Sequence, residues 1–403
     1  MDKEVATGCQ HDDGEGKTYY SWCQQCAIKE LERGFCEWTS SPHVNKLIQW
    51  TQKNMTHWYD HLSFIRYDRL KNIKFYSDGR YGSIYEACWL DGPRWVWNSQ
   101  KNIWECEKNI KVALKIFKNS SNMSVDFLNQ VFNHVKLLTN GSLADFFGIT
   151  EDPSGNYIFV MKLYTDNLSE YLEKNHELMS WWDIVDMLYS IAEGLDQIHA
   201  GGRFHSNLHF GNILIADGAS SIDARISDVG LHGPVDEQRS PTDYYGKISF
   251  TAPEILRNEK PEETKICKFY QAADIYSFGI IMAMISTGKI PFSDREEDEK
   301  LSEDICNKNL HPEIFKESMP QSYYDLMIRC LSSIPEQRPS ANELNLLLGK
   351  WVSDLGDKPN FSEVASQFHE ANDKKWEPTV SMDNIDEKYY LRISEEGETR
   401  CLA

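Results

Sequence analysis

Two segments of this 403-residue chain carry residue types that could hold a phosphate group. Residues 77–84 include Gly79 and Gly82, and glycines let a backbone approach phosphate oxygens because no Cβ stands in the way. Lys115 directly follows the apolar residues 112–114 and supplies a positive charge. Each feature alone has a commoner explanation: a hairpin turn for the glycines and a solvated position for the lysine. Spacing alone does not choose between these explanations, because 33 positions separate Gly82 from Lys115.

Cysteine spacing raises a second chemistry, which is zinc binding. Cys23 and Cys26 have the Cys-x-x-Cys spacing of half a zinc site, and Cys9 with His11 could supply the other half. That second pair lacks the usual spacing, so reduced thiols are favoured over zinc. The ten cysteines are scattered and follow no secretory signal, which predicts reduced thiols in a cytoplasmic protein.

The elements that must position these residues fall into two halves. Alternating and apolar runs predict strands over residues 73–90, 111–117 and 157–163, with a helix over 124–138 between them. Ser41 and Pro42 open an earlier helical pattern as N-cap and first-turn residue. From Trp182 onward helices dominate, and residues 272–286 are apolar nearly all round, which indicates a buried helix. A strand-rich half followed by a helix-rich half predicts an α+β fold of two lobes.

Charge and hydropathy exclude some partners. Asp and Glu outnumber Lys and Arg by 62 to 42, for a formal net charge of −20. A chain this acidic is a poor ligand for nucleic acid or an anionic membrane. No run of about 18 apolar residues exists, so we expect no segment that spans a membrane.

The order of several motifs within residues 70–350 resembles the eukaryotic protein kinase family. The similarity is strongest to the tyrosine-kinase-like branch with serine/threonine chemistry, and to a fungal set in which Cys-rich residues precede a Tyr-Asp-Arg stretch and a Trp-bearing insertion follows it. The matching segments are residues 77–84, Val112-Ala113-Leu114-Lys115, Phe204 to Leu214, Ile226-Ser227-Asp228-Val229-Gly230, Thr251-Ala252-Pro253-Glu254, Asp274-Ile275-Tyr276-Ser277-Phe278-Gly279 and Gln337-Arg338-Pro339.

The resemblance implies that ATP binds with Mg²⁺ between the lobes. Lys115 would hold the phosphates, and Asn212 and Asp228 would bind the metal ion. Met161 would be the gatekeeper before the hinge, and Glu254 would pair with Arg338 in the large lobe. The nucleotide contacts implied are Ser77, Gly79, Gly82, Ile84, Ala113, Lys115, Met161, Lys162, Leu163 and Leu214.

Four positions depart from the family pattern. Asn207 stands where the family has its catalytic Asp, and an amide oxygen accepts a hydrogen bond but is not a useful base. Gln130 replaces the helix Glu that pairs with the lysine, although Asp126 lies one turn earlier on the same face. Ser206 replaces the loop Arg, and Val229 replaces a Phe that links the lobes. The departures predict a pseudokinase or a strongly impaired kinase.

We divide the chain into an N-terminal Cys-containing and helical extension (1–69), a protein kinase domain (70–350) and an acidic tail (351–403) expected to be largely disordered, with one short helix near 361–371. The favoured function is a signalling module that binds ATP and regulates a protein partner. Two alternatives stay open: an active serine/threonine-type kinase acting on a protein substrate, and a kinase-fold scaffold that binds no nucleotide.

Overall fold

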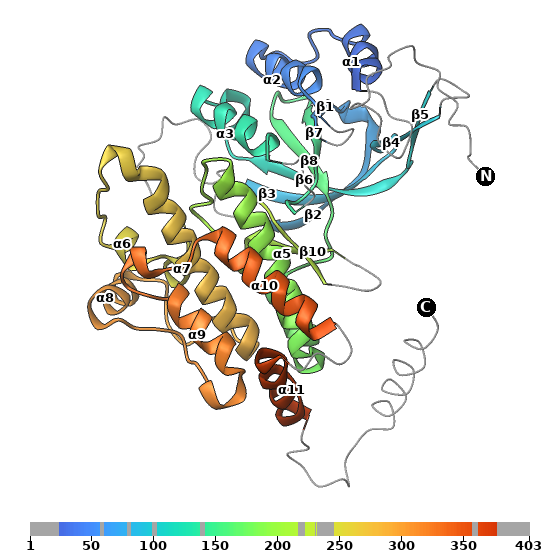
Figure 1. Cartoon of the computed structure of the whole chain (residues 1–403). Coiled ribbons are helices and arrows are strands. Elements are labelled where there is room, and N and C mark those ends of the chain that lie inside the picture. The colour runs from blue at the N-terminus through green and yellow to red at the C-terminus, as the bar shows by residue number, and fades with distance from the viewer. Residues whose placement is uncertain are drawn as a thin grey trace, which may run out of the picture.

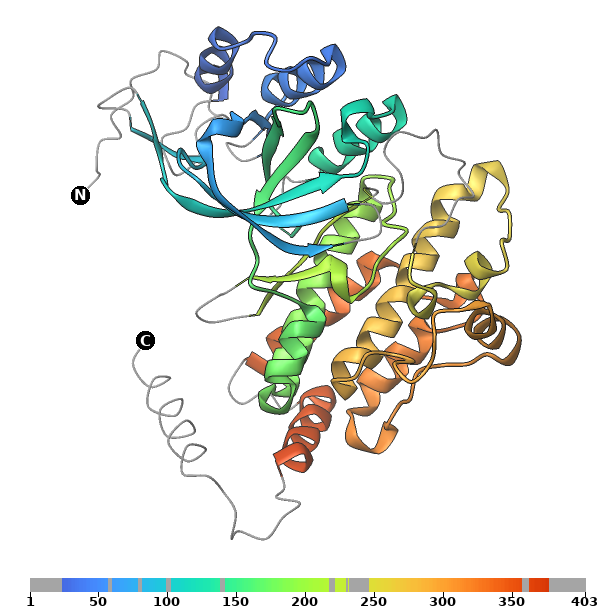
Figure 2. The same ribbon diagram turned by 180° about the vertical axis from the view of Figure 1, so that it is seen from behind.

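The computed structural model describes residues 24–56, 60–78, 82–98, 103–137, 142–216, 222–229, 231, 246–356 and 362–376. Within these residues most strands precede the long helices, and the two groups form separate lobes (Figures 1 and 2). The predicted α+β, two-lobed fold is therefore confirmed. Among the described residues, no helix is both long and apolar enough to cross a lipid bilayer.

A six-stranded sheet forms the small lobe in the order β1-β7-β8-β6-β3-β2. Side chains alternate between the two faces of a strand, so Val112 and Leu114 of β6 enter the core on one face while Ala113 and Lys115 share the other. The sheet thereby points its lysine toward the large lobe. Its strands are β1 Ser63–Phe64, β2 Leu70–Asp78, β3 Gly82–Trp89, β6 Ile110–Phe117, β7 Phe146–Glu151 and β8 Tyr157–Lys162.

Helix α3 (Val125–Val135) covers the sheet where the sequence predicted a helix. Ser124 caps it, because the Ser124 hydroxyl accepts a hydrogen bond from the Phe127 N–H (3.1 Å). Phe127 and Val131 recur at a spacing of one helical turn and are fully buried. Between β3 and β6, the strands β4 (Arg94–Asn98) and β5 (Ile103–Cys106) form an antiparallel hairpin.

The N-terminal extension contributes α1 (Gln24–Arg33) and α2 (Pro42–Lys53). Ser41 caps α2 as predicted, with Pro42 in the first turn. Val44 and Ile48 of α2 are fully buried in the same apolar core as α3, and Trp50 lies 4.2 Å from Phe132, centroid to centroid. The extension is therefore packed onto the small lobe. The strand β1, which follows α2, adds to the sheet by pairing in parallel with β7.

Helices build the large lobe around α7, which is buried along residues 273–285 as its all-round apolar pattern predicted. A three-stranded sheet, β11-β10-β9, lies between this helical body and the small lobe (Figures 1 and 2). The elements are β9 Asp166–Asn167, α4 Leu168–Asn175, α5 Trp181–Ala200, β10 Ile213–Ala216, β11 Asp223–Ile226, α6 Pro253–Leu256, α7 Ile266–Thr287, α8 Glu299–Lys308, α9 Gln321–Cys330 and α10 Ala341–Gly356.

Short 3₁₀ segments connect these elements. They are η1 Tyr67–Arg69, η2 Ser120–Asn122, η4 His176–Leu178, η5 Phe210–Asn212, η6 Ile248–Phe250, η7 Glu263–Lys265, η8 Lys316–Ser318 and η9 Pro335–Gln337. The segment η5 belongs to the loop that carries the candidate catalytic residues, and η6 immediately precedes the Ala252-Pro253-Glu254 motif.

The first part of the tail is helical. It contains the helix expected near 361–371, and it differs from the disorder expected for the tail as a whole. Helix α10 continues through residue 356, and α11 (Glu363–Trp376) packs against the large lobe at its end remote from the small lobe (Figure 1). Phe368 is fully buried against Trp181 and Trp351, with ring centroids 6.0 and 5.3 Å away. The boundary predicted at 350 thus falls inside α10, where Leu348 and Trp351 are buried on either side of it. Residues 377–403 lie outside the described residues.

Candidate active site

A buried carboxylate of α7 holds the loop between α5 and β10 in place. Asp274 of α7 is 1% exposed and accepts hydrogen bonds from the backbone N–H groups of His205 (2.7 Å) and Ser206 (2.9 Å). His199 Nε2 lies 3.0 Å from the same carboxylate. Hydrogen bonds to a buried charge are stronger than neutral ones, so this residue fixes the course of the loop. Asp274 begins one of the segments that carry the resemblance to protein kinases.

His205 links this loop to the segment that carries Asp228. Its Nδ1 accepts from the Asn207 N–H (3.2 Å), which leaves Nε2 to donate to the Ser227 carbonyl (2.8 Å). Burial lowers the pKa of His205, and a neutral ring fits this pattern of one acceptor and one donor nitrogen. The imidazole therefore acts as a structural bridge between two loops.

Asn207 and Asn212 lie side by side in the loop. The Asn212 Nδ2 donates to the Asn207 backbone carbonyl (2.9 Å), so the amide oxygen of Asn212 is the atom left for another ligand. The Asn207 Oδ1 is buried, and it has no hydrogen-bond partner among the described residues. A buried acceptor without a partner is costly, and this oxygen can still accept a hydrogen bond from a further donor.

Lys115 of β6 forms an ion pair with Asp228, where both side chains are largely buried. Burial alone would raise the pKa of Asp228, but the charge of Lys115 and its hydrogen bond lower that pKa below the ordinary value. Asp228 is therefore ionised at neutral pH. The two residues lie 113 positions apart in the chain and in different lobes, so the pair joins the lobes at the candidate site.

The backbone at two site residues adopts a conformation that L-residues rarely use. Ser206 has φ 65° and Asp228 has φ 60°, both in the left-handed region. Such residues cost about 1–3 kcal/mol each and persist where the surroundings hold them. Here Asp274 holds Ser206 and Lys115 holds Asp228.

The structure reveals a residue that sequence reasoning missed, His134 of α3. It is fully buried, and neither ring nitrogen has a hydrogen-bond partner among the described residues. Burial lowers its pKa to about 4; Asp228 opposes this shift, and Lys115 and His205 reinforce it. The sequence held one signal for this residue: His134 follows Gln130 by one helical turn, so both lie on the same face of α3. His134 thus lies in the electrostatic environment of the lysine–aspartate pair.

The implied nucleotide contacts come from both lobes. Ile84 pairs with Lys115 across β3 and β6, and Ala113 pairs with Met161 across β6 and β8. Ala113 and Leu214 pack against one apolar core that both lobes share. The sheet that contains β10 lies below the six-stranded sheet in both views (Figures 1 and 2). The residues implied as nucleotide contacts thus come from strands of both sheets.

The hinge region is fixed by a polar cluster around Asp145. Its carboxylate accepts from the Tyr164 hydroxyl (3.2 Å) and Arg225 Nη1 (3.3 Å), and it lies 3.6 Å from Lys162 Nζ. Burial raises the pKa of Tyr164, and the nearby Asp145 charge adds to this. Leu163 lies between two residues of this cluster, so the cluster restrains the implied hinge.

The glycine-containing loop is described only at its ends. Ser77 pairs with Ile84 near the end of β2, whereas Gly79 lies outside the described residues. A Cβ on Gly82 would lie 2.4 Å from the Ile116 carbonyl oxygen. The close approach of β6 therefore requires glycine at position 82, independently of any phosphate.

The remaining departures from the kinase pattern lie on elements of both lobes. Gln130 is half-buried on α3, and Val229 is 5% exposed within the core that spans the lobes. For the proposed zinc ligands, Cys9, His11 and Cys23 lie outside the described residues, as does the side chain of Cys26. The described part of the chain contains no group of three or more His, Cys, Asp or Glu residues that could hold a metal ion.

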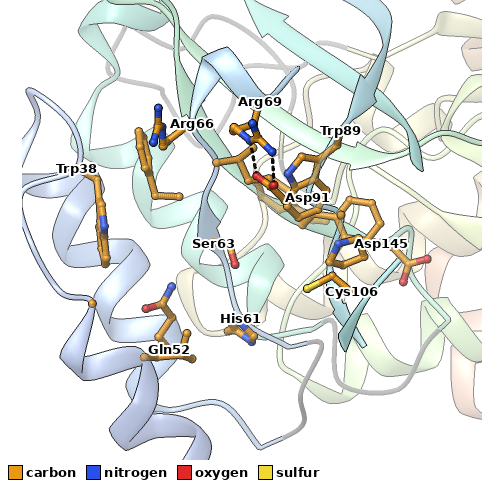
Figure 3. A pocket seen from close by; sticks show the side chains of 18 of the residues that line it. Trp38, Gln52, His61, Ser63, Arg66, Arg69, Trp89, Asp91, Cys106 and Asp145 are labelled. Carbon is orange, nitrogen blue, oxygen red and sulfur yellow. Dashed lines mark hydrogen bonds and ion pairs between the residues drawn. The ribbon is translucent and has the colours of Figure 1, made fainter. Parts of the chain in front are cut away.

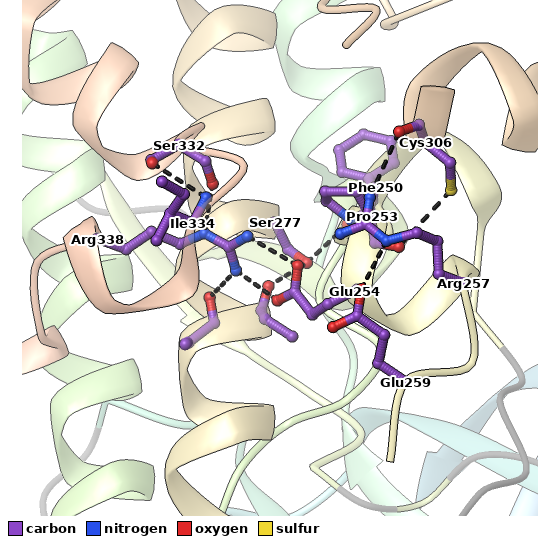
Figure 4. A network of polar contacts seen from close by, with 12 residues as sticks. Phe250, Pro253, Glu254, Arg257, Glu259, Ser277, Cys306, Ser332, Ile334 and Arg338 are labelled. Atoms are coloured by element: carbon purple, nitrogen blue, oxygen red, sulfur yellow. Dashed lines mark hydrogen bonds and ion pairs between the residues drawn. The ribbon is translucent and has the colours of Figure 1, made fainter. Parts of the chain in front are cut away.

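A buried ion pair stabilises the large lobe beside the site (Figure 4). Arg338 donates from both terminal nitrogens to Glu254, over 2.6 and 2.8 Å, and both side chains are 0% exposed. Arg338 also donates to the carbonyls of Ser332 and Ala272 (each 2.8 Å), so four of its five N–H groups have partners. The predicted pair is therefore present.

Two lobes, an anchored loop with two asparagines and a lysine–aspartate pair between the lobes define a protein of the kinase class. A family model for protein tyrosine and serine/threonine kinases matches residues 70–348, more than half of the chain. The chain therefore belongs to the protein kinase family.

Individual relatives are more distant. The chain is 29% identical over 60% of its length to a probable serine/threonine-protein kinase of Dictyostelium discoideum, and 25% identical over 72% to the dual specificity protein kinase pyk3 of the same organism. It is 26% identical over 60% of its length to the human tyrosine-protein kinase TXK. These matches cover 14%, 20% and 43% of the respective relatives, so each relative is much longer than the region it shares.

Proposed function

We propose that this protein kinase domain binds ATP with Mg²⁺ between its lobes and that its phosphoryl transfer is strongly impaired, so that it acts in signalling as a pseudokinase that regulates a protein partner in the cytoplasm. The observation that carries the proposal is the arrangement around Asn207. Lys115 pairs with Asp228, and the Asn212 carbonyl accepts from the N–H of Ser227, next to Asp228. The position that holds the catalytic base in the family pattern carries an amide, Asn207.

The residues present fit the cofactor. Asp228 is ionised and Asn212 has its amide oxygen available, and oxygen ligands of this kind suit Mg²⁺. Lys115 would hold the phosphates after exchanging part of its contact with Asp228. ATP and Mg²⁺ supply the transferable phosphoryl group when bound.

The chain's own residues explain why transfer would be slow. The buried Asn207 Oδ1 can accept a hydrogen bond from a substrate hydroxyl and orient it, but a neutral amide does not take up the proton. Loss of a general base typically costs about 10²–10⁴ in rate. Because phosphoryl transfer depends chiefly on positioning and charge, some activity can persist.

The main alternative is an active kinase that phosphorylates protein hydroxyls. Relatives named as serine/threonine, dual specificity and tyrosine kinases favour it without deciding the acceptor residue. A scaffold without nucleotide would be favoured if the Lys115–Asp228 pair stayed closed under all conditions.

Asn207→Asp is the decisive change. It returns a carboxylate beside Asn212, and we expect phosphate transfer to a generic protein substrate to rise at least about tenfold. Asn207→Ala is the matched control, because it removes the amide without adding a base. The measurement is radiolabelled phosphate incorporation by wild type and both variants.

Nucleotide binding is measured separately by thermal shift with ATP and Mg²⁺. At 100 times the Kd, the expected stabilisation is about 2.7 kcal/mol. No shift at millimolar ATP would leave only the scaffold alternative. Wild-type turnover in the ordinary kinase range of about 1–100 s⁻¹ would instead establish the active kinase.

A further inference from the structure

A cavity of about 660 Å³ lies between the N-terminal extension and the small-lobe sheet (Figure 3). The end of α1, the chain around β1, the ends of β3 and β5, and the beginning of β7 form its walls. None of Lys115, Asn207, Asn212 or Asp228 lines it, so it is separate from the candidate active site. Its volume falls within the range of about 300–1,000 Å³ typical of small-molecule sites.

Aromatic rings form much of the cavity wall. Trp38, from the extension, stands nearly parallel to Phe64 of β1, at an interplanar angle of 13° and a centroid distance of 6.4 Å. Trp89 at the end of β3 contacts Phe147 of β7, with centroids 5.7 Å apart. Figure 3 shows Trp38 and Trp89 on opposite sides of the cavity. Flat aromatic walls on two sides favour a flat aromatic occupant.

The charged groups on the wall are compensated in pairs. Arg33 contacts Glu30 at 2.8 Å, Arg69 contacts Asp91 at 2.6 Å, and Arg66 pairs with Asp68. The Arg69 hydrogen bonds hold the pKa of Asp91 below its usual range, so this pair is ionised on both sides. Asp145 is occupied by the hinge cluster. Three arginines and three carboxylates line the wall, so their formal charges balance and give no net attraction for an ion. A neutral ligand also avoids the cost of leaving water that an ion would meet between the aromatic rings.

Neutral polar groups face the space between these aromatic walls. Ser63 of β1 lies near the middle of the lining in Figure 3, and its hydroxyl has no hydrogen bond among the described residues. Its backbone is engaged in the β1–β7 pairing, which fixes its position. A hydroxyl can donate or accept, so it can orient a ligand with either kind of polar group.

We propose that this cavity is a second binding site, which takes a neutral, planar, aromatic small molecule that carries one hydrogen-bonding group. Cys106, which lines the cavity, is partly buried and forms no disulfide, so its thiol reports on occupancy (Figure 3).

The probe is indole-3-acetamide, which is planar and neutral, and its counterpart is the similarly shaped anion indole-3-acetate. For a ligand of this size we expect a Kd of about 1 mM for the acetamide. At 5 mM, alkylation of Cys106 by iodoacetamide should then slow about sixfold, as followed by peptide mass spectrometry. Alkylation of Cys36, which is exposed, and of Cys88, which does not line the cavity, should not change. The acetate should bind about tenfold more weakly.

Ser63→Phe fills the cavity and should abolish the protection of Cys106, whereas Ser366→Phe on the exposed face of α11 should leave it intact. Both experiments use the full chain, and the wild-type contrast between acetamide and acetate does not depend on the folding of either variant. A cavity that holds only water would give no protection of Cys106. Any one of three results would overturn the proposal: no protection of Cys106, equal binding of the acetate and the acetamide, or protection of Cys106 that persists in Ser63→Phe.

Discussion

Two regions of the molecule follow the kinase pattern to different degrees. One is the set of buried polar residues that hold the large lobe together, called anchors here, and the other is the candidate active site. Asp274, Glu254 and Arg338 match it, and each makes several hydrogen bonds out of contact with solvent. At the site itself, Asn207 and Gln130 depart from the pattern. The difference has a physical basis. Loss of one partner of a buried ion pair leaves an uncompensated charge and threatens the fold, whereas replacement of a carboxylate by an amide of similar shape leaves no such charge.

Retention of the kinase fold and retention of catalysis are two separate properties, although a match to the family suggests both. The anchors keep the loop in its kinase-like course, and that course brings Asn212 near the Lys115–Asp228 pair. The loop geometry is therefore compatible with loss of the base. A well-formed catalytic loop in this chain is evidence for a retained fold and does not by itself establish catalysis.

The largest effect is expected from breaking an anchor. Arg338→Ala leaves Glu254 charged and buried without its partner, so the free energy of unfolding should fall by about 3–5 kcal/mol. Urea unfolding measures it. Arg257→Ala is the control, because Arg257 pairs with Glu259 at the surface and its loss should cost less than about 1 kcal/mol. Equal losses for the two variants would contradict the distinction between anchors and surface pairs (Figure 4).

A smaller effect is expected from the buried imidazole at the site. The pKa of His134 is lowered to about 4 in the folded protein, below its ordinary value of 6.5, so the unfolded chain binds the proton more readily. Stability is therefore lost as the pH falls from about 6.5 toward 4, by about 2 kcal/mol at pH 5. His134→Leu should remove that part of the slope.

The measurement for His134 is urea unfolding at pH 7 and pH 5. The exposed His43→Leu controls for loss of a histidine side chain. His205 and His209 also have lowered pKa values, the latter to about 3 through burial and Lys247, so some slope remains in His134→Leu. An unchanged difference between pH 7 and pH 5 would show that His134 does not titrate in this way.

The smallest effect on stability is expected at Gln130. Gln130→Glu places a carboxylate on α3, where the side chain is only half-buried, so stability should change by less than about 1 kcal/mol. Its effect should appear in activity, as a further gain in phosphate transfer when combined with Asn207→Asp. Asn129→Asp adds the same charge at an exposed neighbouring position and should give no gain. A loss of several kcal/mol on Gln130→Glu would place Gln130 among the anchors.

Local patterns were sufficient to predict many elements. The sequence predicted a helix over 124–138, where α3 lies, and the apolar run 272–286 indicated the buried part of α7. Ser41 with Pro42 marked the start of α2. Motif order predicted the Glu254–Arg338 pair across 84 positions, because the family pattern supplied the contact. The assigned nucleotide and metal roles remain predictions, whereas the positions of the residues are now known.

Other contacts depended on packing that no local pattern encodes. The polar stretch after residue 356 gave little indication that Phe368 would be buried against Trp181, which lies in a helix far back in the chain. The cavity beside β1 arises only where the extension, β3 and β7 meet. No periodic pattern in the sequence predicts the burial of Phe368 or the cavity, because the residues that form each of them come from distant segments of the chain.

The sequence by itself determined the order of the motifs, the α+β division of the chain and the identity of each group at the candidate site, including the amide at Asn207. Only the tertiary structure decided that Lys115 pairs with Asp228 and that His134 is buried near them. The physical reason is that a side chain's partner and its exposure depend on which distant surfaces pack together. Periodicity specifies which face of an element is apolar, but it does not specify what covers that face.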